Sequence, residues 1–396
     1  MIKILRLTNR LNVGGPTFNV ALLSKYIGIE FETKILAGNI EPHESSSSYI
    51  LENLGLSYIN VPQMFRRINP VADFKALIFI IKYINKYKPD IIHTHAAKAG
   101  ALGRIGAFFA KHKTKIIIHT YHGNVFDGYF SLFKSKIILV VERFLARHTT
   151  KIIALSEKQK RELFEKYRIC DSEKIEVVPL GFDLNSFSEN LEFKRTAFRS
   201  SFKIDDNTCV ISIIGRLTSI KNHNFLIEKL ASIKGKTGKK VLLLIVGDGE
   251  DKASIMEFAQ RMNLNVGNVK SNQDARDLDI LFLSWRKDID HINAASDIVA
   301  LCSLNEGTPV SIIEAMSSSR AVITTNVGGI SDFVDNNQNG VVVDFDNYEE
   351  QLLRLIKDED YRNFLASNAS SVYNQFHYTN LIENTRTLYF NCLKSK

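Results

Sequence analysis

Short apolar runs alternate with helical patterns along almost the whole chain, and this alternation limits the possible folds more than any other feature. In the first half, strand-like runs cover Lys3–Leu7, Thr33–Ala37, Ile91–His93, Ile116–His119, Lys151–Leu155 and Ile175–Val178. In the second half, they cover Val210–Ile214, Val241–Val246, Ile280–Leu283, Ile298–Leu301, Val322–Thr324 and Val341–Val343. Apolar runs separated by helices indicate parallel strands covered on both faces. The sequence therefore predicts an α/β protein built on parallel sheets.

The two series of strands are separated by a polar stretch at residues 186–207. A chain of 396 residues is long enough for two domains. We expect two Rossmann-like domains, residues 1–184 and 185–377, that face each other across a cleft. Ligands of such domains bind at the carboxyl ends of the strands. Residues 378–396 are expected to form a terminal helix.

The composition is typical of a soluble globular protein, with 45% hydrophobic and 24% charged residues. The four cysteines are scattered, and Cys209 and Cys302 fall in apolar runs, which favours core positions and a reducing, cytoplasmic compartment. Residues 1–7 resemble a first strand and not a signal peptide. No apolar run approaches the roughly 18–20 residues of a transmembrane helix.

The net charge of +8 is unevenly distributed. Residues 1–184 contain 27 Lys and Arg against 16 Asp and Glu, whereas residues 185–396 contain 24 against 27. A basic first half suggests an anionic partner, such as an anionic membrane surface, although a merely solvated basic surface gives the same count. Nucleic acid is disfavoured, because no basic patch interleaved with aromatic residues is present.

Two glutamates, Glu306 and Glu314, stand on either side of a predicted helix start. The apolar run 297–302 precedes them, and the loop 305–308 opens the helix that carries Glu314. Eight positions is a little over two helical turns, so both carboxylates are predicted to face one site. Backbone N–H groups at the helix start suit phosphate, and carboxylates suit sugar and ribose hydroxyls. The combination favours a nucleotide-activated sugar as the ligand.

A basic motif, Gly215-Arg216-Leu217-Thr218-Ser219-Ile220-Lys221, follows the first strand of the second half. Arg216 and Lys221 together can neutralise a diphosphate and stabilise the charge that builds on it as it leaves. The tight turn at Gly247 follows the next strand and is expected to lie under a nucleotide base. Two cations after a strand are common, so the prediction depends on their combination with the two glutamates.

The first strand of the first half is followed by Asn12-Val13-Gly14-Gly15-Pro16. This loop lacks the G-x-G-x-x-G spacing of a dinucleotide site, so NAD binding is unexpected. Gly14 and Gly15 can still let the backbone approach a phosphate closely, as an alternative to a plain strand-to-helix turn.

Histidines mark the ends of two further strands of the first half. His122 precedes a glycine at an expected cleft edge and is predicted to be functional. His119 lies deeper and is predicted to be a core residue or to support the site from behind. His93 and His95 alternate along a strand end, but no third zinc ligand accompanies them. His95 or Lys98 is a candidate for contact with an acceptor. Three D-x-D triplets, at 277–279, 288–290 and 344–346, are interpreted as chance, so no metal site is predicted.

These motifs resemble the retaining glycosyltransferases of family 4, which have the GT-B fold of two Rossmann-like domains. The resemblance is most specific at Gly215-Arg216-Leu217…Lys221-Asn222 and at Glu306-Gly307-Thr308-Pro309…Glu314-Ala315-Met316. Residues 93–107 and 121–130 look like those of a bacterial subgroup that builds surface polysaccharides, such as capsule, O-antigen or exopolysaccharide.

The resemblance implies a role for each matching residue. Arg216 and Lys221 would bind the donor diphosphate, Glu314 the ribose, and Glu306 the donor sugar. The substrate-binding residues implied or expected at these motifs are Gly14, Gly15, His95, Lys98, Gly215, Gly247, Gly307, Thr308, Pro309, Val310 and Glu314. His122 would contact the sugar near the reacting carbon. Family members retain the anomeric configuration, usually without a metal, and no carboxylate nucleophile or cofactor is assigned.

The expected donor is a nucleotide sugar, by default a UDP-hexose or UDP-N-acetylhexosamine, and the expected acceptor is lipid-linked or a saccharide. The first domain would bind the acceptor, and the final helix would cross back onto that domain. Phe126, Tyr129, Phe130, Leu132 and Phe133, with Lys134 and Lys136, form a candidate membrane contact. Attachment at the inner face of the cell membrane is therefore expected; a core position for these aromatic residues is the alternative.

Two other functions remain open from the sequence. A UDP-sugar 2-epimerase-like enzyme has the same fold, but it needs acid and base carboxylates beyond the two glutamates. A sugar-nucleotide-binding partner without catalytic activity would keep the same site residues. The sequence does not specify the donor base, the acceptor, the linkage or the oligomeric state.

Overall fold

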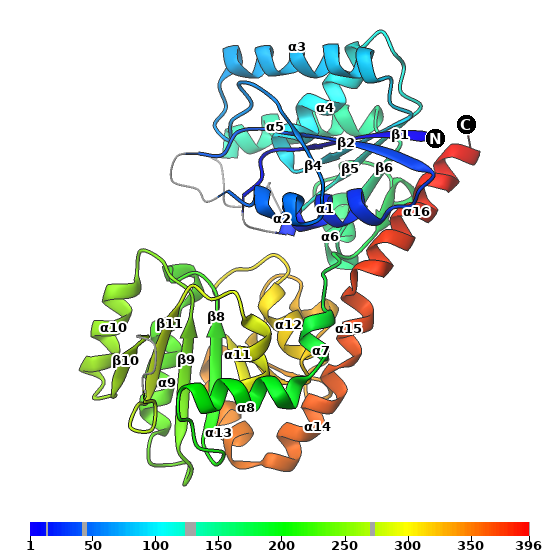
Figure 1. Cartoon of the computed structure of the whole chain (residues 1–396). Coiled ribbons are helices and arrows are strands. Elements are labelled where there is room, and N and C mark those ends of the chain that lie inside the picture. Colours follow the sequence, from blue (N-terminus) through cyan, green and yellow to red (C-terminus); the bar gives the residue numbers. More distant parts are fainter. Residues whose placement is uncertain (13–14, 42–45, 123–131, 270–273, 396) are drawn as a thin grey trace. The chain divides into compact units, whose positions relative to one another are not determined.

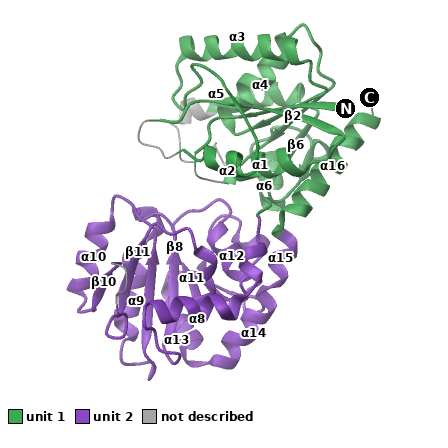
Figure 2. Ribbon diagram, viewed as in Figure 1, with its two compact units in different colours: residues 1–182, 376–396 green, residues 183–375 purple. Residues whose placement is uncertain are grey.

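A computed structural model describes residues 1–12, 15–41, 46–122, 132–269 and 274–395 of the chain. The chain divides into two compact units, shown in different colours in Figure 2. Unit 1 comprises residues 1–182 and 376–396, and unit 2 comprises residues 183–375. The boundary after residue 184 that the sequence suggests lies two residues from the start of unit 2. The terminal segment belongs to unit 1.

Unit 1 contains a seven-stranded sheet in the order β3-β2-β1-β4-β5-β6-β7, in which every pairing within the described ranges is parallel. The strands are β1 (Ile2–Thr8), β2 (Phe31–Ala37), β3 (Ile59–Asn60), β4 (Ile91–His95), β5 (Ile116–Thr120), β6 (Lys151–Ala154) and β7 (Ile175–Val177). The helices are α1 (Gly15–Tyr26), α2 (Ser48–Asn53), α3 (Pro70–Tyr87), α4 (Ala97–Phe109), α5 (Leu132–Arg147), α6 (Glu157–Arg161) and α16 (Tyr378–Lys394).

Successive residues of the central strands face opposite sides of this sheet and bury separate cores. Leu5, Leu7 and Ile92 pack against α3 and α4, whereas Ile4 and Ile91 pack against α1 and α16. Strands that are apolar on both faces require helices on both sides, as the sequence predicts. The terminal helix α16, red in Figure 1, lies beside α1 and completes the second layer.

Unit 2 also contains a seven-stranded parallel sheet, in the order β10-β11-β9-β8-β12-β13-β14. The strands are β8 (Cys209–Ile214), β9 (Val241–Val246), β10 (Val266–Asn268), β11 (Ile280–Ser284), β12 (Ile298–Leu301), β13 (Ala321–Thr325) and β14 (Val341–Val343). The helices are α7 (Asn185–Ser188), α8 (Leu191–Ser201), α9 (His223–Ile233), α10 (Lys252–Arg261), α11 (Ile289–Ala295), α12 (Val310–Ser317), α13 (Tyr348–Lys357), α14 (Glu359–Ala369) and α15 (Ser371–Phe376).

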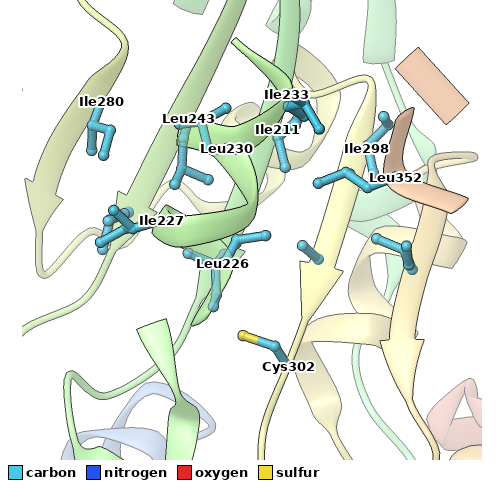
Figure 3. Packing of buried hydrophobic residues seen from close by; sticks show 14 of the residues in the cluster. Ile211, Leu226, Ile227, Leu230, Ile233, Leu243, Ile280, Ile298, Cys302 and Leu352 are labelled. Atoms are coloured by element: carbon cyan, nitrogen blue, oxygen red, sulfur yellow. The ribbon is translucent and has the colours of Figure 1, made fainter. Parts of the chain in front are cut away.

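The core of unit 2 shows why α9 forms where it does. Its apolar residues Leu226, Ile227, Leu230 and Ile233 recur at helical spacing and are buried against the strands. Figure 3 shows them facing Leu243, Ile211 and Ile298. Cys302 lies in the same core, so the predicted core role of this cysteine is confirmed.

All twelve strands predicted from the sequence are present, with ends that shift by at most two residues. Two short strands were not predicted, β3 and β10, which contain two and three residues. Both are very short and contain an asparagine, so no apolar run marks them. Among the described residues, no helix has the length and apolar character needed to cross a membrane.

Candidate functional site

The sheet order of unit 2 places two loops together. Strands β8 and β12 are neighbours in the sheet, and the chain leaves them in opposite directions, toward β9 and toward β13. This is a topological switch point, where the loops after two adjacent parallel strands diverge and leave room for a ligand. The loop after β8 carries Arg216 and Lys221, and the loop after β12 carries Glu306.

An ion pair joins these two loops. Lys221 Nζ lies 2.5 Å from Glu306 Oε1, and Ser303 Oγ donates a hydrogen bond of 2.7 Å to the same carboxylate oxygen. Both charged side chains are partly exposed, at 22% and 13%. The backbone N–H of Leu304 donates to the carbonyl of Ile220 at 2.8 Å, which holds the loops together independently of the side chains. Ser303 was not predicted, because a serine after a strand carries no distinctive signal.

Arg216 lies on the same loop as Lys221. It is exposed, and no ion pair or side-chain hydrogen bond joins it to another residue in the part of the chain that the structure describes. Lys221 lies close to Gly215, where an added Cβ would meet the lysine side chain at 3.4 Å. The loop after β8 thus carries one cation that is ion-paired, Lys221, and one that has no ion pair among the described residues, Arg216.

Glycines set the backbone around the two loops. Gly247 has a φ of +136°, and a Cβ there would lie 1.9 Å from the carbonyl oxygen of Gly215. Gly328 has a φ of +58°, and a Cβ there would lie 2.2 Å from the carbonyl oxygen of Gly307. Neither position accepts a side chain without moving the backbone. Gly307 differs, because an added Cβ would meet nothing within 4 Å and would project into open space.

The second glutamate lies within α12. Pro309 is the N-cap residue, Val310 begins the helix, and Glu314 follows in its second turn. Glu306 lies in the loop before the helix, as the sequence predicts, so this loop and the first turns of α12 together set the spacing of the two carboxylates. Burial, reinforced by the negative charge of Asp290, raises the pKa of Glu314 to about 8, although the residue keeps part of its surface accessible.

This arrangement suits a ligand that is both anionic and rich in hydroxyl groups. Arg216 and Lys221 provide positive charge, and Thr308, Pro309 and Val310 form the start of α12, where the first backbone N–H groups lack intrahelical acceptors. The carboxyl groups of Glu306 and Glu314 can accept hydrogen bonds from hydroxyls. Among the described residues, no group of three His, Cys, Asp or Glu side chains is placed to hold a metal ion.

Unit 1 has a corresponding site at its own switch point, between β1 and β4. A cavity of about 570 Å³ lies there. Its wall is formed by Asn9, Arg10, Pro16, Arg66, Ile68, Asp73, Ala96, Ala97, Lys98, Ala101, Leu102, His122, Ile137, Ile138, Val141 and Glu142. Half of these residues are alanine, leucine, isoleucine or valine. Three are cationic and two are anionic, and the two carboxylates, Asp73 and Glu142, are paired with Lys98 and Arg104, so the cavity combines an apolar wall with a net positive charge.

Several histidines at the ends of β4 and β5 lie close together at this cavity or behind it. His122 lines the cavity, and its Nε2 lies 3.0 Å from Nδ1 of His95. Burial lowers the pKa of His122 to about 4, so the ring is neutral at neutral pH and can donate or accept a hydrogen bond. His95 is completely buried and lies behind His122 without lining the cavity. His119 is also completely buried, with Nδ1 2.9 Å from Thr94 Oγ1, as predicted for a core residue.

The remaining predicted residues of unit 1 are placed as follows. Lys98 lies in the cavity wall, where its Nζ pairs with Asp73 Oδ1 at 2.7 Å. Gly15 begins α1, and an added Cβ would make only an ordinary contact, 3.6 Å from Leu180. Gly14 lies outside the described residues, as do Phe126, Tyr129 and Phe130.

A second ion pair was missed by the sequence analysis. Arg104 of α4 donates from Nη2 to both oxygens of Glu142 of α5, at 2.9 and 2.8 Å, and Tyr121 donates its hydroxyl to Glu142 at 2.6 Å. Both charged side chains are almost completely buried, at 1% and 7% exposed. In the sequence, the two residues are 38 positions apart in separate helices, so no local pattern marks them as partners.

Models of two protein families match the chain. The family described as glycosyltransferase family 4 matches residues 38–186, and the family described as glycosyl transferases group 1 matches residues 194–372. An Escherichia coli UDP-Gal:alpha-D-GlcNAc-diphosphoundecaprenol alpha-1,3-galactosyltransferase is 31% identical over 344 residues, which is 85% of this chain and 84% of the relative. The Staphylococcus aureus capsular polysaccharide biosynthesis glycosyltransferase CapM is 28% identical over 397 residues, covering 95% and 97%.

Solved structures share the fold over the whole chain. Anabaena HepE in complex with UDP superposes with a TM-score of 0.79 at 20% identity and covers 98% of this chain and 100% of its own. A sucrose-phosphate synthase from Thermosynechococcus elongatus superposes with a TM-score of 0.76 at 18% identity and covers 100% of both chains. The predicted GT-B fold is confirmed by these structures and by the two parallel sheets.

Proposed function

This chain belongs to the family 4 glycosyltransferases, and from that premise we propose that it transfers a hexose or N-acetylhexosamine from a UDP-sugar to a lipid-linked acceptor in the synthesis of a surface polysaccharide. The observation that carries the proposal is the Lys221–Glu306 pair at the switch point of unit 2. A relative that acts on a diphosphoundecaprenol-linked sugar and a capsular relative support the acceptor class.

The diphosphate of the donor is assigned to the loop after β8. Arg216 has no internal partner among the described residues, and Lys221 shares its charge with one carboxylate. A diphosphate carries more negative charge than Glu306 and can draw both cations toward it. As the bond to the sugar breaks, negative charge builds on the diphosphate, and the two cations stabilise it. No metal is needed to supply that charge, so we propose a metal-independent reaction.

The sugar and ribose are assigned to the glutamates. Glu306, with the backbone of Gly307 and Thr308, would bind the donor sugar, and the open space at Gly307 leaves room for it. Glu314, with a pKa of about 8, is largely protonated at neutral pH and can both donate to and accept from ribose hydroxyls. Neither glutamate is assigned as a nucleophile, and we propose retention through attack of the acceptor on the face that the diphosphate leaves.

The acceptor is assigned to the cavity of unit 1. Its apolar wall suits the hydrocarbon segment next to a lipid diphosphate, and Arg10, Arg66 and Lys98 supply positive charge for the diphosphate itself. Neutral His122 is proposed to hydrogen-bond a sugar hydroxyl at this cavity. An enzyme that uses such an acceptor is expected to work at the inner face of the cell membrane, as a peripheral protein.

Transfer of labelled sugar from a panel of UDP-hexoses and UDP-N-acetylhexosamines to a short-chain lipid-diphosphate-linked sugar tests the proposal. We expect transfer from one donor, in EDTA as well as without it, with product of the same anomeric configuration as the donor. Loss of transfer in EDTA would contradict metal independence, and an inverted product would contradict retention. Release of an epimerised UDP-sugar without transfer, or binding of UDP without any reaction, would refute the proposed function.

A further inference from the structure

An apolar stripe runs along the outer face of α5. Ile137, Val140, Val141 and Phe144 recur at intervals of three and four residues, and each is 40% exposed or more. A surface helix normally directs such a stripe into the core. Here the opposite side of α5 already packs inward, through Glu142 and Ala146, which are buried. The exposed stripe is therefore additional to the core, and each of its four side chains keeps at least 40% of its surface accessible.

The stripe continues onto the end of α4. Phe144 and Phe108 both contact the ring of His148, with centroids 5.0 Å apart in each case, and Phe108 contacts Phe109 at 5.1 Å. Phe109 is 65% exposed. At its other end, the stripe reaches the cavity of unit 1, because Ile137 and Val141 line both. We call this surface, formed by Phe108, Phe109, Ile137, Val140, Val141 and Phe144, the α4–α5 face.

The charged residues around the α4–α5 face indicate the kind of partner that binds it. Residues 66–147 contain 15 Lys and Arg but only 4 Asp and Glu. Of the acidic residues that the structure describes there, Glu142 is buried with Arg104, Asp73 is paired with Lys98, and Asp90 is partly buried. Lys111 and Lys136, which lie next to the face in sequence, are both exposed. The described part of this segment exposes many cations and no fully exposed carboxylate.

Exposed apolar side chains surrounded by cations match the surface of an anionic lipid bilayer. The apolar groups enter the headgroup region, and each cation gains from the negative surface potential. A second copy of the chain is a poorer partner, because an isologous dimer would bring the cations of both copies together. We infer that the α4–α5 face is the surface through which unit 1 binds anionic membrane, with the cavity opening beside the lipid. The inference gives a location to the membrane attachment in the proposed function and rests on it only for the identity of the acceptor.

Sedimentation with lipid vesicles tests the inference. We expect the full chain to bind vesicles of phosphatidylcholine with phosphatidylglycerol far better than phosphatidylcholine alone, and binding to weaken as salt is added. The double variant Phe109→Ser/Val140→Ser and the double variant Lys111→Glu/Lys136→Glu should each lower the partition coefficient by about tenfold or more. Matched controls, Ile29→Ser/Phe193→Ser and Lys240→Glu/Lys357→Glu, replace exposed residues elsewhere and should bind as the parent does.

The possible outcomes distinguish a failure of the membrane-binding inference from a failure of the proposed sugar transfer. Parent protein that ignores anionic vesicles, or test variants that bind as well as their controls, would overturn the inference. Parent dimers in light scattering that the Phe109→Ser/Val140→Ser variant dissociates, without vesicle binding, would assign the face to self-association instead. Vesicle binding without sugar transfer would refute the proposed function and leave the face supported. Transfer to a short-chain acceptor that persists in the test variants is the result expected if the face serves the membrane alone.

Discussion

The two units each place one lysine or arginine against one glutamate near a switch point, yet the two pairs differ in exposure. Arg104 and Glu142 in unit 1 are 1% and 7% exposed, and Tyr121 adds a third hydrogen-bonding group. Lys221 and Glu306 in unit 2 are 22% and 13% exposed, and Arg216, on the same loop as Lys221, has no ion pair or side-chain hydrogen bond among the described residues. A buried pair held by several hydrogen bonds keeps its elements together, whereas a partly exposed pair can exchange its carboxylate for a ligand. The difference predicts that the first pair serves stability and the second serves catalysis.

Removal of Lys221, the cation of the partly exposed pair, should have the largest effect, and the effect should fall on the rate of sugar transfer. Lys221→Ala is expected to lower kcat by about 10²–10³-fold, because the charge that builds on the leaving diphosphate loses one of its stabilising partners. Initial rates with saturating UDP-sugar would measure the effect, and thermal unfolding should change little. Lys240→Ala, at an exposed lysine of the same unit, is the matched control and should keep the parental rate. A normal rate in Lys221→Ala would show that the pair is structural in unit 2 as well.

Removal of the glutamate should destabilise the fold more for the buried pair Arg104–Glu142 than for the partly exposed pair Lys221–Glu306. Glu142→Ala leaves the Arg104 guanidinium buried without its countercharge and is expected to cost about 3–5 kcal/mol in the free energy of unfolding. Glu306→Ala should cost about 1 kcal/mol, because Lys221 can turn toward water. Urea unfolding of both variants gives the comparison. Glu176→Ala, which breaks the exposed pair with Lys151, is the control in unit 1, and equal losses in the Glu142 and Glu306 variants would contradict the distinction.

These two pairs also show how far the sequence could predict the molecule. The alternation of apolar runs and helices predicts the strands of both sheets, because each central strand is buried on both faces and leaves a continuous signal. Arg216, Lys221 and Glu306 were singled out because each follows such a strand. Arg104 and Glu142 lie inside helices that show no unusual pattern, and only the packing of α4 on α5 makes them partners. Of the residues that line the cavity of unit 1, only Lys98 and His122 were singled out, since the rest of the wall comes from several separate segments.

The pKa of Glu314 offers a test of unit 2 that depends on pH. The pKa is about 8 in the folded chain against 4.5 for an ordinary glutamate. Above pH 4.5 the unfolded chain releases this proton and the folded chain keeps it, so the contribution of Glu314 to stability falls as pH rises to about 8. Glu314→Gln cannot ionise and should therefore gain stability relative to the parent between pH 5 and pH 8, by a few kcal/mol at roughly 1.4 kcal/mol per unit of pKa. Urea unfolding at pH 5 and pH 8 measures the difference in free energy of unfolding between Glu314→Gln and the parent. If this difference is the same at both pH values, the carboxyl group of Glu314 is solvated and its pKa is not raised.

Alanine substitutions at two glycines of unit 2 should have the smallest effects. They distinguish a glycine that the backbone conformation requires from a glycine that leaves room for a ligand. Gly328→Ala places a Cβ at positive φ and 2.2 Å from the carbonyl oxygen of Gly307, so it should cost about 2 kcal/mol in the free energy of unfolding. Gly307→Ala meets no atom within 4 Å and should change the free energy of unfolding by less than about 0.5 kcal/mol. If the donor sugar occupies the space beside Gly307, this second variant should still raise the Kd for UDP-sugar more than the Kd for UDP. Calorimetric titration of both ligands decides this, because equal affinities in parent and variant would place the sugar elsewhere.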